Sequence, residues 1–249
     1  MSQQTQIDRV VVKFAPFIEK FPTPLACAQS SLGDLLVLWQ GLGYPRRCRN
    51  LHAAANVMVA DFDGQVPGTL EELMALPGVG PYTARAVLAF AVGADVGVVD
   101  TNVARLISRV VNRELRGGEL QAIADDTVPI GHGWEWNQIV MDFGANVCTA
   151  SAPKCSACPI HSHCAWQGGP GPDPAPGTAG TSKPQARFEG SNRQARGRFM
   201  RALVEGGVSS SRAAQVMGLQ AHPLRSARVV QSLLDDGLIV VNDSMYRLP

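Results

Sequence analysis

The chain has 249 residues, a hydrophobic content of 45% and a formal net charge of +1 at pH 7. This length is enough for one large or two modest domains, and no apolar run is long enough to span a membrane. The sequence shows no signal peptide, which favours a cytoplasmic protein over a secreted or membrane one. A net charge this small does not by itself indicate a nucleic-acid partner.

The first 165 residues are predicted to be almost wholly helical. Apolar residues recur at helical spacing, and Gly and Pro residues separate the runs. Thr69 is the predicted N-cap of one helix, with Glu72 as its capping-box partner. The predicted helices are residues 7–21, 32–39, 50–62, 69–76, 82–92, 103–111, 119–128 and 134–147.

Two of these helices are joined by the hairpin sequence Leu76-Pro77-Gly78-Val79-Gly80. Gly78 and Gly80 let the backbone turn sharply and leave its amides uncovered. Amides at a helix N-terminus are a ready site for a phosphate group. About twenty residues later, Asp100 stands at the start of another helix, where the ordinary role of an Asp is to cap the helix. The pairing of a phosphate-binding turn with a lone carboxylate is more informative than either feature alone.

Four cysteines follow the last of these helices, at Cys148, Cys155, Cys158 and Cys164. Thiolates this close in sequence can converge on one metal centre, and sulfur ligation fits zinc or an iron–sulfur cluster. Structural zinc sites more often use two closely spaced pairs, and only one such pair is present. The spacing alone therefore leaves both metals open. Cys27 and Cys48 lie outside the run and are interpreted as ordinary buried thiols.

The C-terminal third has a different character. Residues 166–187 are rich in Gly and Pro and predict a flexible linker. Residues 188–249 predict a separate small domain with helices at 192–205, 211–217 and 223–236. Gly237 is the predicted C-cap, and strands at 238–241 and 245–248 flank a predicted turn at Asn242-Asp243. Three helices followed by a hairpin resemble a winged helix. This fold binds DNA in some proteins and mediates protein–protein contacts in others.

Together with the hairpin, Asp100 and the cysteines, four segments closely resemble MutY-type adenine DNA glycosylases of the helix-hairpin-helix, endonuclease III superfamily. The resemblance covers residues 1–165. It implies a mainly α fold with a glycosylase domain at 1–165, a [4Fe–4S] cluster loop at 148–164 held by the four cysteines, and the winged-helix-like domain at 188–249. The segments are Gln3-Gln4-Thr5-Gln6, Trp39-Gln40-Gly41-Leu42-Gly43-Tyr44, Arg49-Asn50-Leu51-His52 and Met141-Asp142-Phe143-Gly144-Ala145.

The resemblance implies a monofunctional DNA N-glycosylase of base-excision repair that removes adenine mispaired with 8-oxoguanine or guanine. The target base must leave the stack, and cleavage of its N-glycosidic bond builds positive charge on the sugar. Asp100 would stabilise or capture that centre, and Asn102 would orient Asp100 or the sugar. Tyr82 occupies the position where bifunctional relatives carry a nucleophilic Lys, so no Schiff base can form.

The resemblance also assigns contacts with double-stranded DNA. Leu76, Gly78, Val79 and Gly80 of the hairpin would hold the DNA backbone. Gln4 and Tyr44 resemble residues that the family wedges into the base stack around the lesion. We expect a monomer in the cytoplasm, associated with the nucleoid and without a membrane partner.

Two departures from the family pattern matter. The family places a catalytic Glu two residues before the Met that aligns with Met1, outside residues 1–249. General acid catalysis contributes ~10²–10⁴-fold, so we expect a chain that starts at Met1 to excise adenine very slowly or not at all. Many relatives also carry a larger β-rich domain that reads 8-oxoguanine, and here the winged-helix-like domain stands in its place.

Two alternative functions stay open. Thymine-mismatch glycosylases of the superfamily can also carry a Tyr at the position of Tyr82, and a non-catalytic DNA-binding module would fit the absent Glu. The segments Gln3-Gln4-Thr5-Gln6 and Arg49-Asn50-Leu51-His52 favour an adenine glycosylase over a thymine glycosylase.

We expect residues 1–249 to differ in excision from an extended version that reaches upstream through the Glu. With protein in excess over an 8-oxoguanine:adenine duplex, we expect alkali-labile sites on the adenine strand only with the extended version. Equal cleavage by both would show that another group supplies the proton.

Overall fold

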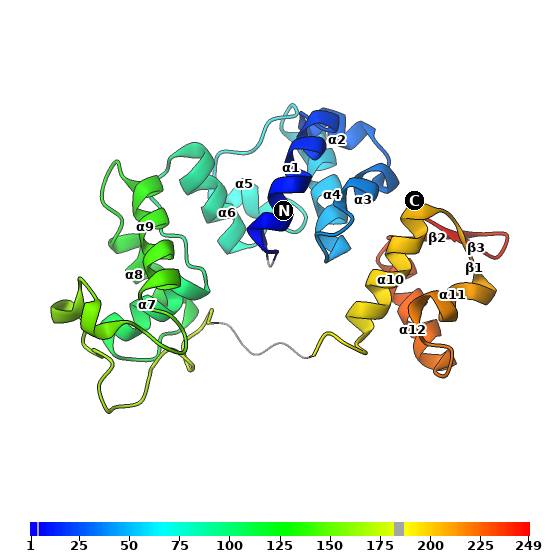
Figure 1. Cartoon of the computed structure of the whole chain (residues 1–249). Coiled ribbons are helices and arrows are strands. Elements are labelled where there is room, and N and C mark those ends of the chain that lie inside the picture. Colours follow the sequence, from blue (N-terminus) through cyan, green and yellow to red (C-terminus); the bar gives the residue numbers. More distant parts are fainter. Residues whose placement is uncertain (4, 182–186) are drawn as a thin grey trace. The chain divides into compact units, whose positions relative to one another are not determined.

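The computed structural model describes residues 1–3, 5–181 and 187–249 (Figure 1). The predicted role of Gln4 therefore lies outside the described residues. The chain forms two compact units. Unit 1 is Met1–Pro67, Leu76–Gly78 and Ala186–Pro249, and unit 2 is Gly68–Ala75 and Val79–Gln185. The mainly helical fold is confirmed, and no helix among the described residues is long and apolar enough to cross a membrane.

The N-terminal helices of unit 1 largely follow the apolar pattern. The short helix α2 is not predicted, although Thr23 caps it by accepting a hydrogen bond from the Ala26 amide at 3.1 Å. Helix α4 begins at Pro45 rather than at Asn50, because a proline is well suited to the first position of a helix. These helices are α1 (Ile7–Lys20), α2 (Pro24–Gln29), α3 (Leu32–Trp39) and α4 (Pro45–Asp61).

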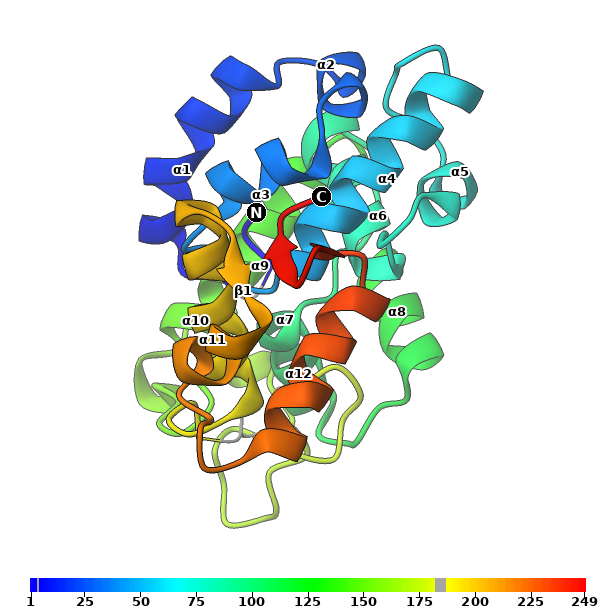
Figure 2. The same ribbon diagram turned by 90° about the vertical axis from the view of Figure 1, so that its right-hand side faces the viewer.

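The C-terminal elements confirm the three helices and the terminal hairpin (Figure 2). The strands form one antiparallel sheet in the order β1-β3-β2, of which β1 is not predicted. The turn is Asp243-Ser244 rather than Asn242-Asp243, with φ values of 49° and 60° that fit a type I′ turn. The elements are α10 (Asn192–Glu205), β1 (Val208–Ser209), α11 (Ser210–Met217), α12 (Pro223–Asp235), β2 (Val240–Asn242) and β3 (Met245–Arg247).

The two ends of the chain share one hydrophobic core in unit 1. Phe17, Leu35 and Trp39 belong to the same buried cluster as Phe199 and Leu233. Polar contacts join the same elements. Asp236 accepts hydrogen bonds from Arg46 at 2.7 Å and Arg196 at 2.6 Å, and its carbonyl accepts one from Arg49 at 2.8 Å. The C-terminal elements therefore complete the hydrophobic core of residues 1–67. The predicted domain boundaries stay a prediction.

Unit 2 is built around α7, which packs against both α8 and α9. The predicted helix at 82–92 is confirmed, but its second half is the π-helical segment η1, which ends at Val92 and is capped by Gly93 with φ 79°. The elements of unit 2 are α5 (Leu70–Ala75), α6 (Pro81–Val87), η1 (Leu88–Val92), α7 (Thr101–Val111), α8 (Gly117–Asp126), α9 (Gly133–Asn146), and the short 3₁₀ turns η2 (Cys155–Ala157) and η3 (His161–His163).

Part of the predicted linker packs against unit 2. Pro174, Ala175 and Thr178 are buried, and the Thr178 hydroxyl accepts a hydrogen bond from the Leu115 amide at 3.1 Å. The composition of the predicted linker does not reveal this packing, because Gly and Pro occur in well-ordered turns as well as in flexible segments. The flexibility of residues 166–187 as a whole stays a prediction.

Asp236 is predicted to be important for the stability of unit 1. Burial on its own would raise the pKa of Asp236, but the hydrogen bonds from Arg46 and Arg196 hold it below its ordinary value. Asp236→Asn should lower the free energy of unfolding by about 2 kcal/mol at pH 7. This figure already allows for the weaker contribution of the exposed Arg46.

Urea denaturation checks this expectation. The control is Asp235→Asn, an exposed neighbour whose carboxylate accepts a hydrogen bond from Gln231. A carboxylate with a lowered pKa stabilises the fold above its unfolded pKa of about 3.9, and this contribution is lost as the pH falls through the folded pKa. The difference between the parent and Asp236→Asn should therefore shrink below about pH 4. Equal effects of the two substitutions would contradict the proposed role.

Candidate functional site

Asp100 caps the N-terminus of α7 and still has hydrogen-bonding capacity to spare. Its Oδ1 accepts hydrogen bonds from the amides of Asn102 and Val103 at 2.8 and 2.7 Å. Its Oδ2 accepts one from Asn102 Nδ2 at 3.0 Å. A carboxylate oxygen can accept two hydrogen bonds, so Oδ2 retains room for another group. The capping role and a chemical role are therefore both available to this half-buried residue.

Arg105 holds the residue that orients Asp100. The Oδ1 of Asn102 accepts a hydrogen bond from Arg105 Nη2 at 2.9 Å. The same guanidinium donates to the carbonyls of Gly144 at 2.5 Å and Cys148 at 2.7 Å. Arg105 is 7% exposed, so these acceptors replace water around the charge. A continuous chain of contacts thus joins the first predicted cluster ligand to Asp100.

Tyr82 lies in the first turn of α6. Burial, and secondly the charge of Asp100, raise the pKa of Tyr82 above its ordinary value. The hydroxyl therefore remains protonated and neutral near pH 7. Hydrogen bonds join two of the three predicted catalytic residues, Asp100 and Asn102, and the charge of Asp100 acts on the pKa of the third, Tyr82.

The hairpin has the backbone geometry that its glycines predict. Gly78 has φ +77°, and a Cβ there would lie 2.4–2.8 Å from three side-chain atoms of Asn50. Gly80 is the N-cap of α6 and has no side chain to cover the first turn. Leu76 is 2% exposed, so a ligand of the hairpin would meet its backbone rather than its side chain. The close approach of Gly78 to the Asn50 side chain also gives a structural reason for Asn50 in the Arg49-Asn50-Leu51-His52 segment.

Tyr44 stands at a strained position in front of α4. It is a half-buried non-glycine residue with φ 48°, and Arg193 Nη1 donates to its hydroxyl at 3.5 Å. The Arg47 guanidinium lies 5.4 Å from its ring centre and donates to Thr5 Oγ1 at 2.7 Å. The resemblance predicts a wedge role for Tyr44, and nothing in the sequence indicates this support from both ends of the chain.

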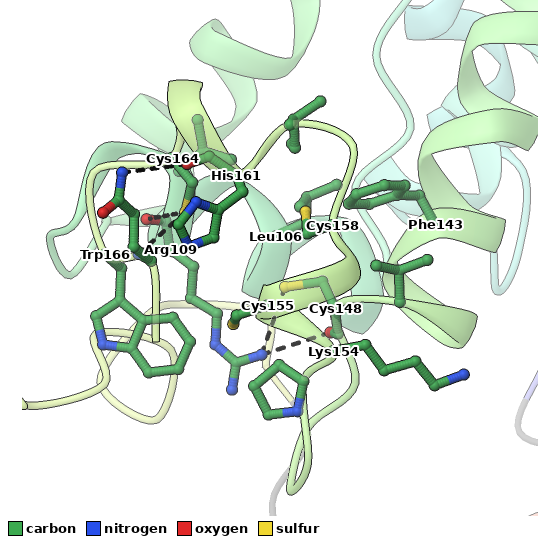
Figure 3. Close-up of a pocket in the computed structure, with 15 residues that line it drawn as sticks. Leu106, Arg109, Phe143, Cys148, Lys154, Cys155, Cys158, His161, Cys164 and Trp166 are labelled. Atoms are coloured by element: carbon green, nitrogen blue, oxygen red, sulfur yellow. Dashed lines mark hydrogen bonds between the residues drawn. The ribbon is translucent and has the colours of Figure 1, made fainter. Parts of the chain in front are cut away.

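The four predicted ligands line one pocket in unit 2 (Figure 3). Burial, and secondly the neighbouring thiols of Cys148, Cys158 and Cys164, raise the pKa of Cys155 above its ordinary value. Among the described residues, no group of three or more His, Cys, Asp or Glu side chains is arranged as a ready metal site. The pocket walls are otherwise largely apolar, with Leu106, Phe143 and Ile160 among them.

The residues present fit an anionic thiolate-bound group. Four thiols supply a complete set of ligands for a cluster. Arg109 is 1% exposed and its Nη1 lies 3.4 Å from Cys148 Sγ, so a cation stands ready to offset thiolate charge. Sequence reasoning misses both Arg105 and Arg109. Their burial could have been inferred from their positions, three and seven residues after Asn102 on the same face of an amphipathic helix.

Comparison with known proteins adds independent findings. The family model described as HhH-GPD superfamily base excision DNA repair protein matches residues 1–119. The chain is 37% identical to the adenine DNA glycosylase of Mycolicibacterium smegmatis, over 96% of this chain and 81% of that protein. It is 36% identical to that of Mycobacterium tuberculosis, over 100% of this chain and 83% of that protein. The C-terminal elements are therefore matched in the M. tuberculosis enzyme as well.

Solved structures share the fold. A thermostable thymine-DNA glycosylase matches with a TM-score of 0.62 and 27% identity, over 67% of this chain and 79% of that chain. A trapped endonuclease III–DNA covalent intermediate matches with a TM-score of 0.61 and 27% identity, over 67% and 80% of the two chains.

The contact between Gly78 and Asn50 generates a stability prediction with a matched control. Gly78→Ala and Gly64→Ala both place a side chain at positive φ, which costs about 1–2 kcal/mol. At Gly64 a Cβ meets nothing within 4 Å, whereas at Gly78 it meets Asn50. Thermal or urea unfolding should show a larger loss for Gly78→Ala, and duplex binding should weaken only in that variant. Equal losses would contradict the tight fit of the hairpin against α4.

Proposed function

The chain belongs to the adenine DNA glycosylases of the HhH-GPD superfamily, and we propose that it removes adenine mispaired with 8-oxoguanine or guanine from double-stranded DNA. The observation that carries the proposal is the setting of Asp100. Its carboxylate is fixed by hydrogen bonds from the N-terminus of α7 and from Asn102.

Asp100 acts on the sugar of the extruded nucleotide. As the N-glycosidic bond breaks, positive charge develops on the sugar, and a preorganised carboxylate stabilises that charge or captures the sugar covalently. The two amides on Oδ1 prevent the carboxylate from rotating away. Oδ2, which has one bond from Asn102, is then the oxygen presented to the sugar or to the incoming water.

Tyr82 makes the enzyme monofunctional. A Schiff base needs an amine, and the phenol of Tyr82 cannot supply one. The product is an intact abasic site on the adenine strand. The backbone amides of the Leu76–Gly80 hairpin and the start of α6 hold the DNA phosphates, with Gly78 and Gly80 allowing close approach. Tyr44 fills the stack beside the lesion.

The cysteine loop holds a [4Fe–4S] cluster through Cys148, Cys155, Cys158 and Cys164. Such a cluster, held by these four thiolates, would supply a structural centre rather than a reactant. We further propose that the enzyme acts as a monomer and associates with the nucleoid. The four thiols in one pocket and the arginine beside them support the cofactor assignment.

A second candidate function is excision of thymine opposite guanine. The observation that favours it is the structural match to a thymine-DNA glycosylase. The higher identity to adenine DNA glycosylases, over more of the chain, supports the first candidate.

The role of Asp100 predicts a separation of excision from binding. Asp100→Asn should slow adenine excision by at least ~10²-fold, because the charge that stabilises the transition state is lost. DNA affinity should stay within a factor of about two, because Asn can still cap α7.

Single-turnover assays of alkali-labile sites on 8-oxoguanine:adenine and guanine:thymine duplexes test both candidates, with the extended version of the chain as parent. Asp126→Asn, an exposed carboxylate of unit 2, is the control for the charge change. Undiminished excision by Asp100→Asn would contradict the assigned role of Asp100. Cleavage of the thymine strand alone would favour the second candidate.

A further inference from the structure

Arg109 is the most deeply buried charged side chain beside the cysteine loop. It is 1% exposed, and it lies one helical turn after Arg105 on α7. Its Nη1 and Nη2 donate to the carbonyls of Thr149 at 2.7 Å and Ala150 at 3.1 Å. The guanidinium also stacks on Trp166, 4.6 Å from the ring centre. Arg109 therefore fixes the backbone directly after Cys148.

The exit of the loop lies on the same turn of α7. The amide of Ala165 donates to the Val110 carbonyl at 2.9 Å, and the amide of Trp166 donates to the Arg109 carbonyl at 3.2 Å. The entrance of the loop is thus held by the Arg109 side chain and its exit by the Arg109 and Val110 backbone. The entrance of the loop therefore depends on how the Arg109 side chain is oriented.

The carboxylate that pairs with this buried cation comes from the predicted linker. Asp173 accepts hydrogen bonds from Arg109 Nε at 3.0 Å and Nη2 at 2.6 Å, one on each of its oxygens. This bidentate arrangement fixes the plane of the guanidinium as well as its charge. A buried cation without such a partner is strongly unfavourable. Asp173 therefore determines where the remaining donors of Arg109 point.

Asp173 is itself held in place by the residues that follow it. Its Oδ1 accepts a hydrogen bond from the Ala175 amide at 3.0 Å. At the far end, Thr178 Oγ1 accepts from the Leu115 amide at 3.1 Å, and the Ala179 amide donates to the Leu115 carbonyl at 2.9 Å. We call residues 173–179 the strap. The strap contacts α7 at Arg109 and the chain beyond α7 at Leu115, so it is part of unit 2 rather than a free connection.

We propose that Asp173 is a positioning residue of the cysteine loop, which keeps Arg109 oriented so that Cys148 is retained as a cluster ligand. The inference rests on the proposed [4Fe–4S] assignment. Without the Asp173 carboxylate, Arg109 loses its counter-charge and its fixed plane, and the carbonyls of Thr149 and Ala150 lose their donors. Cys148 then becomes mobile, and the cluster is released more readily although all four cysteines remain.

The experiment follows cluster retention rather than activity. The parent, Asp173→Asn, Asp173→Glu and the control Asp126→Asn are purified anaerobically as holoproteins. Iron per chain is measured first. Decay of the visible cluster absorbance is then followed with an iron chelator, at a temperature where circular dichroism shows every variant folded.

We expect Asp173→Asn to lose its cluster ~10-fold faster than the parent, as is typical for residues that orient metal ligands. Asp173→Glu keeps the charge and should recover most of the retention, and Asp126→Asn should match the parent. Parental retention by Asp173→Asn would overturn the inference and leave the cofactor assignment standing. Failure of Asp173→Glu to recover any retention would overturn the role of the carboxylate charge. A parent that contains zinc and no iron would overturn the cofactor assignment together with this inference.

Discussion

Two buried guanidinium groups on α7 constrain the rest of unit 2. Arg105 and Arg109 are 7% and 1% exposed, so their donors must find acceptors within the protein. They find them in the carbonyls of Gly144, Cys148, Thr149 and Ala150, where α9 ends and the cysteine loop begins. Since both arginines lie on one face of one helix, the loop has a fixed position relative to Asp100 at the start of that helix.

This arrangement anchors the cysteine loop to the same helix that Asp100 caps. A carboxylate that stabilises a transient charge must be held to within a fraction of an ångström, and a helix N-terminus with a side-chain network provides that precision. Asn102 links the Arg105 guanidinium to Asp100. The Cys148 carbonyl at the start of the cysteine loop holds Arg105, and Arg105 in turn holds the Asn102 side chain that donates to Asp100.

The sequence predicts the parts with local signatures and misses those that depend on tertiary contacts. The hairpin glycines, the capping position of Asp100 and the closely spaced cysteines can be recognised because backbone geometry or ligand chemistry demands those residue types. Arg105, Arg109 and Asp236 are missed because charged residues are usually exposed, and their burial follows from partners distant in sequence. The strap is missed because Gly and Pro suggest a linker, although the buried Ala175 and Thr178 pack against unit 2.

The most direct test of this account is the excision rate of Arg105→Lys, measured under single turnover in the extended version of the chain together with its duplex affinity. Lysine keeps the charge but lacks the planar fork that reaches Asn102, Gly144 and Cys148 at once. If Arg105 positions Asn102 and Asp100, excision should slow by ~10-fold or more at unchanged affinity. Excision at the parental rate would contradict the claim that α7 transmits the position of the loop to Asp100.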